Sequence, residues 1–311
     1  MTSLLSPVAV IGAGAMGSGI AALFAARGVD VVLIDPMEGA LPRAEANIER
    51  QLHVLLAGGD IAPAMQRIRY DAGLEAACNA ALVIEAVPEK LELKRDIFSR
   101  LDSLCGPATI LATNTSGLSI NAIAQAVTRR DRFVGTHFFT PADVIPLVEV
   151  VRNDGTSDHA VAQVMDTLRH VGKRPVLVKR DIPGFIANRI QHALAREAMS
   201  LLESGVASAE DIDEVVKWSL GIRLALSGPL EQRDMNGLDV HLAIAEYLYA
   251  DLENRTEPSD LLRSKVRAGE LGAKSGQGFY AWPPERRERV LRDKSAALAQ
   301  LVRWLNERPP A

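Results

Sequence analysis

The segment that most constrains the fold runs from residue 7 to residue 35. Residues 7–11 are apolar and rich in valine and isoleucine, and they lead directly into Gly12-Ala-Gly-Ala-Met-Gly17. Residues 31–34 form a second apolar segment, which ends at the carboxylate of Asp35. Short apolar segments without polar alternation are typical of strands buried on both faces of a parallel sheet. The pattern therefore predicts a strand, a helix and a second strand, with GxGxxG at the start of the helix.

This unit predicts a dinucleotide site. Glycines permit a tight turn and a close approach of the backbone to a pyrophosphate, which the N-terminus of the helix attracts. Asp35 is placed to accept hydrogen bonds from the adenosine ribose hydroxyls and would repel a 2′-phosphate, and Pro36-Met37 supply no arginine to receive one. The sequence therefore favours NAD over NADP. The residues expected to contact it here are Gly12, Gly14, Ala15, Met16, Gly17 and Asp35.

The remainder of the chain divides into an alternating part and a helical part. Strand and helix patterns alternate up to residue 180, which predicts an α/β, doubly wound, mostly parallel Rossmann-type domain over residues 1–180. After Asp181-Ile-Pro-Gly184 the periodicity is helical only, so residues 181–311 are expected to form a separate all-α domain. Helices are expected in the first domain at 38–56, 88–104, 119–127 and 158–171, with a shorter segment at 63–69. In the second domain helices are expected at 185–203, 234–251, 258–268 and 286–306, and a further helix is expected to begin after its cap at Ser208.

Composition excludes several classes of protein. A net charge of −4 and a pI near 5.9 provide no basic face for nucleic acid or an anionic membrane. Residues 1–26 carry no charged side chain, but glycines interrupt them and no basic flank precedes them, so neither a signal peptide nor a membrane span is expected. Cys78 and Cys105 are too few for a disulfide framework or a zinc site, which favours a reducing cytoplasm and no metal.

A histidine and a glutamate are expected to face each other between residues 135 and 151. One strand ends at His137, a loop contains Pro141 and Pro146, and a second strand contains Glu149. If the two strands are neighbours, the carboxylate can fix the tautomer of the imidazole and stabilise its protonated form, as a general base requires. From these residues alone, a buried structural pair and a catalytic pair both remain open.

Six short motifs, in order over residues 7–282, resemble those of the L-3-hydroxyacyl-CoA dehydrogenase family. They are the glycine motif, Val87-Pro-Glu-Lys-Leu-Glu-Leu-Lys94, Asn114-Thr-Ser116, His137-Phe-Phe with Leu147-Val-Glu149, Pro183-Gly-Phe-Ile-Ala-Asn-Arg189 and Gly272-Ala-Lys-Ser-Gly-Gln-Gly-Phe-Tyr280. The resemblance implies an NAD-dependent oxidoreductase that interconverts L-3-hydroxyacyl-CoA and 3-oxoacyl-CoA, in fatty acid metabolism. It also implies a homodimer formed through the helical domain.

The resemblance further implies a catalytic centre of His137, Glu149, Ser116 and Asn188. His137 would take the hydroxyl proton as hydride leaves for the nicotinamide, and Glu149 would stabilise the imidazolium. Ser116 and Asn188 would hydrogen-bond the substrate oxygen, in a cleft between the domains. The positions that match family contacts to NAD are Glu89, Lys94, Ser116, Thr140 and Lys274.

Departures from the family pattern leave the substrate open. Thr140 stands where the family usually has asparagine. The helical arm after Asp35 is short and contains no lysine before Lys90, although CoA carries phosphates; arginines of the arm could substitute, namely Arg43, Arg50, Arg67 and Arg69. Residues 218–229 look more like relatives that act on small free hydroxy acids, such as L-gulonate or carnitine dehydrogenases, and Arg223 would then pair with the substrate carboxylate. The acyl-CoA thioester is the leading interpretation and the free hydroxy acid is the alternative. A non-catalytic NAD-binding protein, or one chain of a larger β-oxidation complex, is a more remote possibility.

Overall fold

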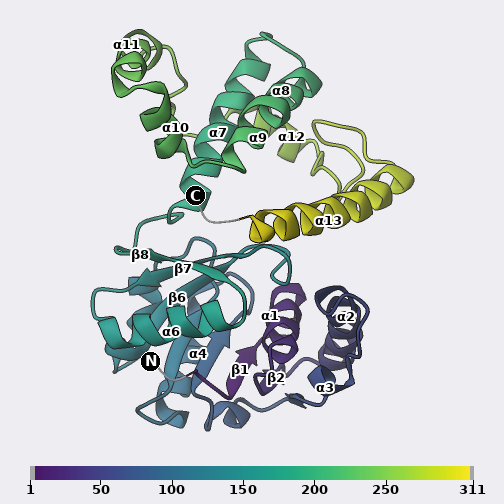
Figure 1. Cartoon of the computed structure of the whole chain (residues 1–311), viewed down its shortest axis with the longest axis vertical. Helices are drawn as coiled ribbons and strands as arrows, with labels where there is room; N and C mark the ends of the chain where they lie inside the picture. The colour runs from purple at the N-terminus through teal and green to yellow at the C-terminus, as the bar shows by residue number, and fades with distance from the viewer. Residues whose placement is uncertain (1–3, 309–311) are drawn as a thin grey trace. The chain divides into compact units, whose positions relative to one another are not determined.

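The structure, a computed structural model, describes residues 4–308 of the 311-residue chain. The chain forms two compact units, one of residues 1–188 with 298–311 and the other of residues 189–297 (Figure 1). The division falls at Asn188, whereas the domain boundary at residue 180 was placed from the linker pattern alone and stays a prediction. The physical reason for the later division is that the backbone of residues 186 and 187 is hydrogen-bonded to Glu149 of the sheet.

The first unit is built on an eight-stranded sheet of order β3-β2-β1-β4-β5-β6-β7-β8. Every neighbouring pair is parallel except β6 and β7, which are antiparallel. The doubly wound, mostly parallel sheet is therefore confirmed. The strands are β1 (Val8–Ile11), β2 (Val31–Ile34), β3 (Ile68–Asp71), β4 (Leu82–Glu85), β5 (Ile110–Thr113), β6 (Phe133–Phe138), β7 (Leu147–Arg152) and β8 (Arg174–Val178).

Hydrophobic cores lie on both faces of this sheet. Along β1, Val8 and Val10 belong to one core and Ala9 and Ile11 to the other, because successive side chains of a strand point to opposite faces. One core takes side chains from α1, α2, α3 and α6, and the other from α4 and α5. These helices are α1 (Ala15–Ala26), α2 (Ala40–Leu55), α3 (Ala62–Met65), α4 (Leu91–Leu104), α5 (Ile120–Ala124) and α6 (Asp158–His170), with 3₁₀ turns η1 (Leu74–Ala77) and η2 (Arg130–Arg132).

The edge strand β3 was not predicted. Residues 63–69 were expected to form one short segment, but α3 ends at Met65 and β3 begins at Ile68. Only Ile68 of this strand is buried, because β3 lies at the edge of the sheet and pairs with β2 alone. A half-exposed strand lacks the continuous apolar pattern by which the central strands were recognised.

The second unit is helical. Ser208 caps α8 as expected, since its hydroxyl accepts the N–H of Asp211 at 3.1 Å. The single helix expected over 234–251 is wrong, because Gly237, at φ +94°, separates two helices there. The elements are α7 (Ala187–Glu203), α8 (Ala209–Val215), the π-helical η3 (Val216–Gly221), α9 (Ile222–Leu224), α10 (Pro229–Asn236), α11 (Leu238–Leu248), α12 (Asp260–Arg267) and α13 (Pro284–Glu307).

Two helices belong to both units. The first two residues of α7 and the last turns of α13, from residue 298 onward, group with the first unit. There Arg174 of β8 donates a hydrogen bond to the side-chain oxygen of Asn306 at 3.0 Å.

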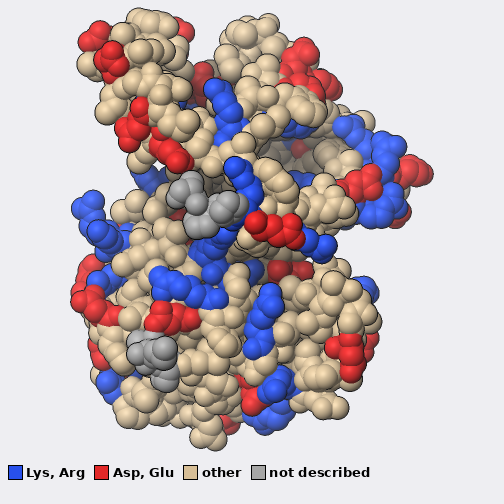
Figure 2. Space-filling model, viewed as in Figure 1, with Lys and Arg blue, Asp and Glu red and all other residues tan. Residues whose placement is uncertain are grey.

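Within residues 4–308 no helix is long and apolar enough to cross a membrane. Acidic and basic side chains are mixed over the face shown in Figure 2.

Candidate active site

The glycine turn after β1 needs its glycines for two different reasons. A Cβ on Gly12, which has φ +101°, would lie 2.8 Å from the carbonyl oxygen of Ala86, and one on Gly17 would lie 1.8 Å from the oxygen of Gly12. A Cβ on Gly14 would meet nothing within 4 Å. The first and third glycines therefore permit close packing, while Gly14 leaves the N-terminus of α1 open to a ligand. The first turn of α1 has no side-chain cap, so it suits a phosphate group.

Asp35 lies beside this turn at the end of β2. Its carboxylate accepts the N–H of Ala13 at 2.8 Å and the N–H of Met37 at 2.9 Å. These two bonds fix the carboxylate next to the glycine turn. The turn and this acid together fit a dinucleotide that carries free ribose hydroxyls.

The antiparallel pairing of β6 and β7 brings His137 and Glu149 together. The two residues are direct partners in the register, and Nδ1 of His137 lies 2.9 Å from Oε2 of Glu149. Both residues are buried, His137 at 4% exposure and Glu149 at 2%. The imidazole also packs against the rings of Phe139 and Phe185, with centroid distances of 4.3 and 5.7 Å.

The second oxygen of Glu149 holds the start of α7. Oε1 accepts the N–H groups of Ile186 at 2.9 Å and Ala187 at 3.0 Å. Burial by itself would raise the pKa of Glu149, but the hydrogen bonds from His137 and from these two N–H groups outweigh burial and hold the pKa below its usual value. Glu149 is therefore a carboxylate at neutral pH and can stabilise a charged imidazole.

Asn188 and Ser116 are joined, although they lie 72 residues apart in the chain. The side-chain amide of Asn188 donates to the backbone oxygen of Ser116 at 2.7 Å. Ser116 lies in the exposed turn after β5, and its N–H bonds to Oε1 of Glu89 at 2.9 Å. The structure thus brings Asn188, Ser116 and Glu89 into one hydrogen-bonded group.

Glu89 is in turn linked to a buried ion pair. Lys94 is fully buried, and its ammonium lies 2.7 Å from Oε1 of Glu85 and 3.4 Å from Oε2 of Glu89. Burial by itself would raise the pKa of Glu89, but the Thr115 hydroxyl, the charge of Lys94 and the N–H of Ser116 hold the pKa below its usual value. Glu85 was not identified from the sequence, although an acidic residue inside an otherwise apolar strand was a signal that it had a buried partner.

The chain also matches known proteins along most of its length. Residues 7–182 match the NAD-binding domain of 3-hydroxyacyl-CoA dehydrogenases, and residues 184–282 match the C-terminal domain of the same enzymes. The chain belongs to the 3-hydroxyacyl-CoA dehydrogenase family. It is an NAD-dependent oxidoreductase that acts on CH–OH groups, which confirms the fold, the cofactor and the class of enzyme expected from the motifs.

Two curated relatives differ in their substrates. The chain is 37% identical over 309 residues to 5-formyl-3-hydroxy-2-methylpyridine 4-carboxylate 5-dehydrogenase of Mesorhizobium japonicum, covering 98% of this chain and 100% of the relative. It is 41% identical over 278 residues to a probable 3-hydroxybutyryl-CoA dehydrogenase of Deinococcus radiodurans, covering 88% and 99%.

Solved structures include relatives with both kinds of substrate. The crystal structure of the pyridine carboxylate dehydrogenase, described as an NAD⁺-dependent dismutase, has a TM-score of 0.91 at 35% identity and covers 99% of this chain and 100% of its own. The structure of (S)-3-hydroxybutyryl-CoA dehydrogenase from Ralstonia eutropha has a TM-score of 0.75 at 36% identity and covers 90% and 99%. The family thus contains enzymes for both a CoA thioester and a small ring carboxylate.

Side chains from two other segments of the chain contact the loop between β6 and β7. The hydroxyl of Thr140, where the family usually has asparagine, lies 3.2 Å from the sulfur of Met16 in the glycine turn. The buried ammonium of Lys173 donates to the backbone oxygens of Ala142 and, at 2.7 Å, Ile145. Burial lowers the pKa of Lys173 to about 8. Lys173 was not identified from the sequence, because nothing in its neighbourhood marks a lysine as buried.

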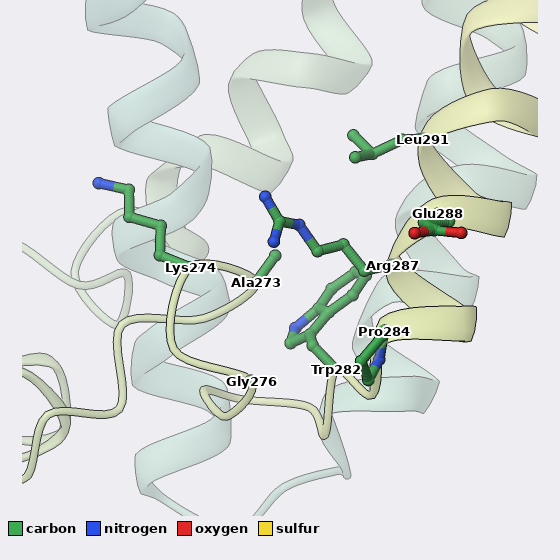
Figure 3. A pocket seen from close by; sticks show the side chains of 8 residues that line it. All are labelled: Ala273, Lys274, Gly276, Trp282, Pro284, Arg287, Glu288 and Leu291. Atoms are coloured by element: carbon green, nitrogen blue, oxygen red, sulfur yellow. The ribbon is translucent and has the colours of Figure 1, made fainter.

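Lys274 and Arg223 lie in the second unit. Lys274 lines an open pocket of about 470 Å³ between the loop before α13 and the start of that helix, with Trp282 and Arg287 among its lining residues (Figure 3). Arg223 is exposed on α9, and its Nε donates to the backbone oxygen of Ser219 at 3.2 Å. Their roles toward NAD and substrate stay predictions.

Among residues 4–308, no cluster of His, Cys, Asp or Glu side chains is arranged to hold a metal ion.

The charge of Glu149 should make stability depend on pH. We expect Glu149→Gln to lower the free energy of unfolding at pH 7 by about 2 kcal/mol, because hydrogen bonds to a charged group are lost. The folded-state pKa lies below the ordinary 4.5, so the wild-type carboxylate contributes stability above that pH and loses it as the pH falls through the folded pKa.

The difference in melting temperature between the two proteins should therefore be largest near neutral pH and should shrink below pH 4.5. Thermal unfolding between pH 7 and pH 3 would measure it. Glu92→Gln, at a side chain that is 82% exposed, serves as the control and should leave stability nearly unchanged. A difference that stays constant over this range would show that the charge of Glu149 does not stabilise the fold.

Proposed function

We propose that the protein catalyses reversible hydride transfer between NAD and the carbon of an alcohol, with His137 as the general base. The observation that carries this proposal is the buried pair of His137 and Glu149, 2.9 Å apart. Because Nδ1 faces Glu149, Nε2 is the nitrogen that would exchange a proton with the substrate hydroxyl. Bound NAD supplies the acceptor for the hydride.

The other residues of the site position and stabilise. Glu149 stabilises the imidazolium that forms when His137 accepts the proton. The hydroxyl of Ser116 is exposed and would hydrogen-bond the substrate oxygen as it changes from alcohol to carbonyl. Asn188 bonds to the backbone of Ser116, so it would hold this turn in place as well as contact the substrate.

The role of His137 can be tested directly. We expect His137→Gln to lower kcat by about 10²–10⁴-fold, because a glutamine side chain cannot accept the proton of the substrate hydroxyl. NADH binding, followed by fluorescence, should stay intact, and turnover is followed by NADH absorbance. His159→Gln, on the exposed face of α6, is the matched control and should behave as wild type. Unchanged turnover in His137→Gln would remove His137 from this role.

For the substrate we propose a small free carboxylate that carries an alcohol or the corresponding carbonyl. Similarity to the pyridine carboxylate enzyme covers 98% of this chain, including residues beyond the family match that ends at 282. The absence of lysine between Asp35 and Lys90 also supports a substrate without CoA phosphates. A 3-hydroxyacyl-CoA thioester of fatty acid metabolism is the second candidate, and the 41% identity to a 3-hydroxybutyryl-CoA dehydrogenase favours it.

Two assays distinguish these candidates. NADH formation is measured with a panel of free hydroxy acids and NAD, and NADH loss with acetoacetyl-CoA. We expect the higher kcat/KM with a free acid, and we expect Arg223→Ala to lower that value by about ten- to hundred-fold, because an ion pair with the substrate carboxylate is lost. Arg267→Ala, at an exposed arginine of the same unit, is the control. Rapid turnover of acetoacetyl-CoA with no activity on any acid would favour the thioester instead.

We further propose that the protein is a homodimer formed through the helical unit. Large apolar side chains of this unit are exposed in the single chain, among them Trp218 at 72%, Leu230 at 81% and Met235 at 75%. No residue of α8, α10, α11 or α12 is buried. Helices normally bury one apolar face, and a second copy of the same surface would cover these side chains.

Analytical ultracentrifugation tests the dimer. We expect a mass of about twice 33.6 kDa for the wild type, and a shift toward the monomer for Leu230→Glu, which places a charge on the apolar surface. Glu231→Gln, at the neighbouring exposed position, is the control. A wild-type mass of 33.6 kDa at micromolar concentration would contradict the proposal.

The free thiols of Cys78 and Cys105 support a reducing, cytoplasmic location.

A further inference from the structure

The topology of the first unit indicates where each half of the dinucleotide lies. Strand β1 has β2 on one side and β4 on the other, so the connections diverge at β1 and β4, where open α/β sheets bind their ligands. The glycine turn packs directly on the segment after β4, since a Cβ on Gly12 would lie 2.8 Å from the oxygen of Ala86. If the adenosine half lies toward Asp35 at the end of β2, the nicotinamide half would extend toward the ends of β4 and β5.

A cluster of three charges lies at these strand ends. Glu85 is the last residue of β4, and its carboxylate accepts hydrogen bonds from the ammonium of Lys94 at 2.7 and 3.0 Å and from the hydroxyl of Thr113 in β5 at 2.6 Å. Lys94 also lies 3.4 Å from Glu89. Glu89 binds the turn after β5 through the N–H groups of Ser116 at 2.9 Å and Gly117 at 3.2 Å.

The charge cluster of Glu85, Lys94 and Glu89 is not neutral. Two carboxylates and one ammonium sum to a net charge of −1. Glu85 and Lys94 are fully buried and closely paired, while the side chain of Glu89 is 42% exposed and lies farther from the ammonium. The uncompensated negative charge therefore faces outward at Glu89, beside Ser116. Because its partners are buried, water and salt screen it less than an ordinary surface carboxylate.

We propose that this cluster makes the enzyme distinguish the two oxidation states of its cofactor. The nicotinamide ring of NAD⁺ carries a positive charge, and the dihydropyridine ring of NADH does not. A fixed negative charge near the ring would therefore favour binding of the oxidised form over the reduced form. Lys94 moderates the effect, because without it the two carboxylates would repel each other and the cluster would carry twice the charge.

A second way for Glu89 to act is by hydrogen bonding alone. A carboxylate that only accepts bonds from ribose hydroxyls or orders the Ser116 turn contributes equally to both forms of the cofactor. The ratio of the two dissociation constants, Kd for NAD⁺ over Kd for NADH, separates the charge effect from the hydrogen bonds, because only an electrostatic effect on the ring changes it.

The experiment measures both dissociation constants, by calorimetry for NAD⁺ and by fluorescence for NADH, on the full-length protein. We expect Glu89→Gln to raise the ratio of Kd for NAD⁺ over Kd for NADH by about three- to ten-fold, because the variant lacks the one negative charge that the proposal places near the ring. Glu89→Asp keeps the charge, so the ratio should stay within about two-fold of wild type even if both affinities fall. Glu92→Gln removes a charge from the first turn of α4, the helix that follows Glu89, at an 82% exposed side chain and should change neither constant.

Glu85→Gln provides a second test from within the cluster. It also removes one negative charge and should raise the same ratio, while circular dichroism checks that the variant with an altered buried ion pair is folded. Equal weakening of NAD⁺ and NADH by Glu89→Gln, or no change in either, would overturn the proposal. The inference rests on the NAD site of the proposed function, but binding is measured without substrate. Loss of the His137 or substrate proposals would therefore leave this test intact.

Discussion

The proposed catalytic centre depends on the hydrogen bonds made by the carboxylate of Glu149. One oxygen bonds to the imidazole of His137 and the other to the N–H groups of Ile186 and Ala187 at the start of α7. The next residue of that helix is Asn188, which bonds to the turn of Ser116. A single buried carboxylate thus orients the imidazole and fixes the helix start that carries a second polar side chain of the site. Such a group is costly to bury, and here each oxygen has its own donors, which offsets the cost.

The cofactor end of the unit is organised by strand ends. Parallel strands end at one edge of the sheet, so the turns after β1, β2, β4 and β5 lie next to one another. Those turns carry the glycines, Asp35, Glu89 and Ser116. The pair of Glu85 and Lys94 lies beneath them with no exposure to solvent. A fully buried ion pair contributes little to stability by comparison with an apolar pair, but here its ammonium also lies 3.4 Å from Glu89 and holds that carboxylate in position.

The second unit poses a different physical problem. Its helices expose apolar side chains that a stable helical domain would bury, such as Trp218 and Leu230. The family accommodates substrates as different as a CoA thioester and a pyridine carboxylate on one fold. Chemistry at the alcohol carbon is therefore common to the fold, while the choice of substrate depends on side chains around it.

Much of the first unit could be predicted from the sequence because its signals are local. Central strands are buried on both faces and leave continuous apolar segments, the glycine motif lies within one βαβ unit, and only a short loop separates His137 from Glu149. The register that pairs those two residues follows from that loop. The break at Gly237 was missed because it does not interrupt the apolar pattern of the two helices that it separates. Strand β3 was missed because it is half-exposed and has no continuous apolar pattern.

The sequence by itself thus determined the family, the cofactor, the class of reaction and the residue types that the chemistry needs. Only the tertiary structure decided which polar groups that are distant in the chain share a bond. Asn188 meets Ser116 across 72 residues, Thr113 meets Glu85 across 28, and Lys173 reaches Ile145 through the packed interior across another 28. The reason is physical: local patterns record which faces of a strand or helix are buried, whereas the partner of a buried charge is chosen by the packing of segments that are distant in the chain.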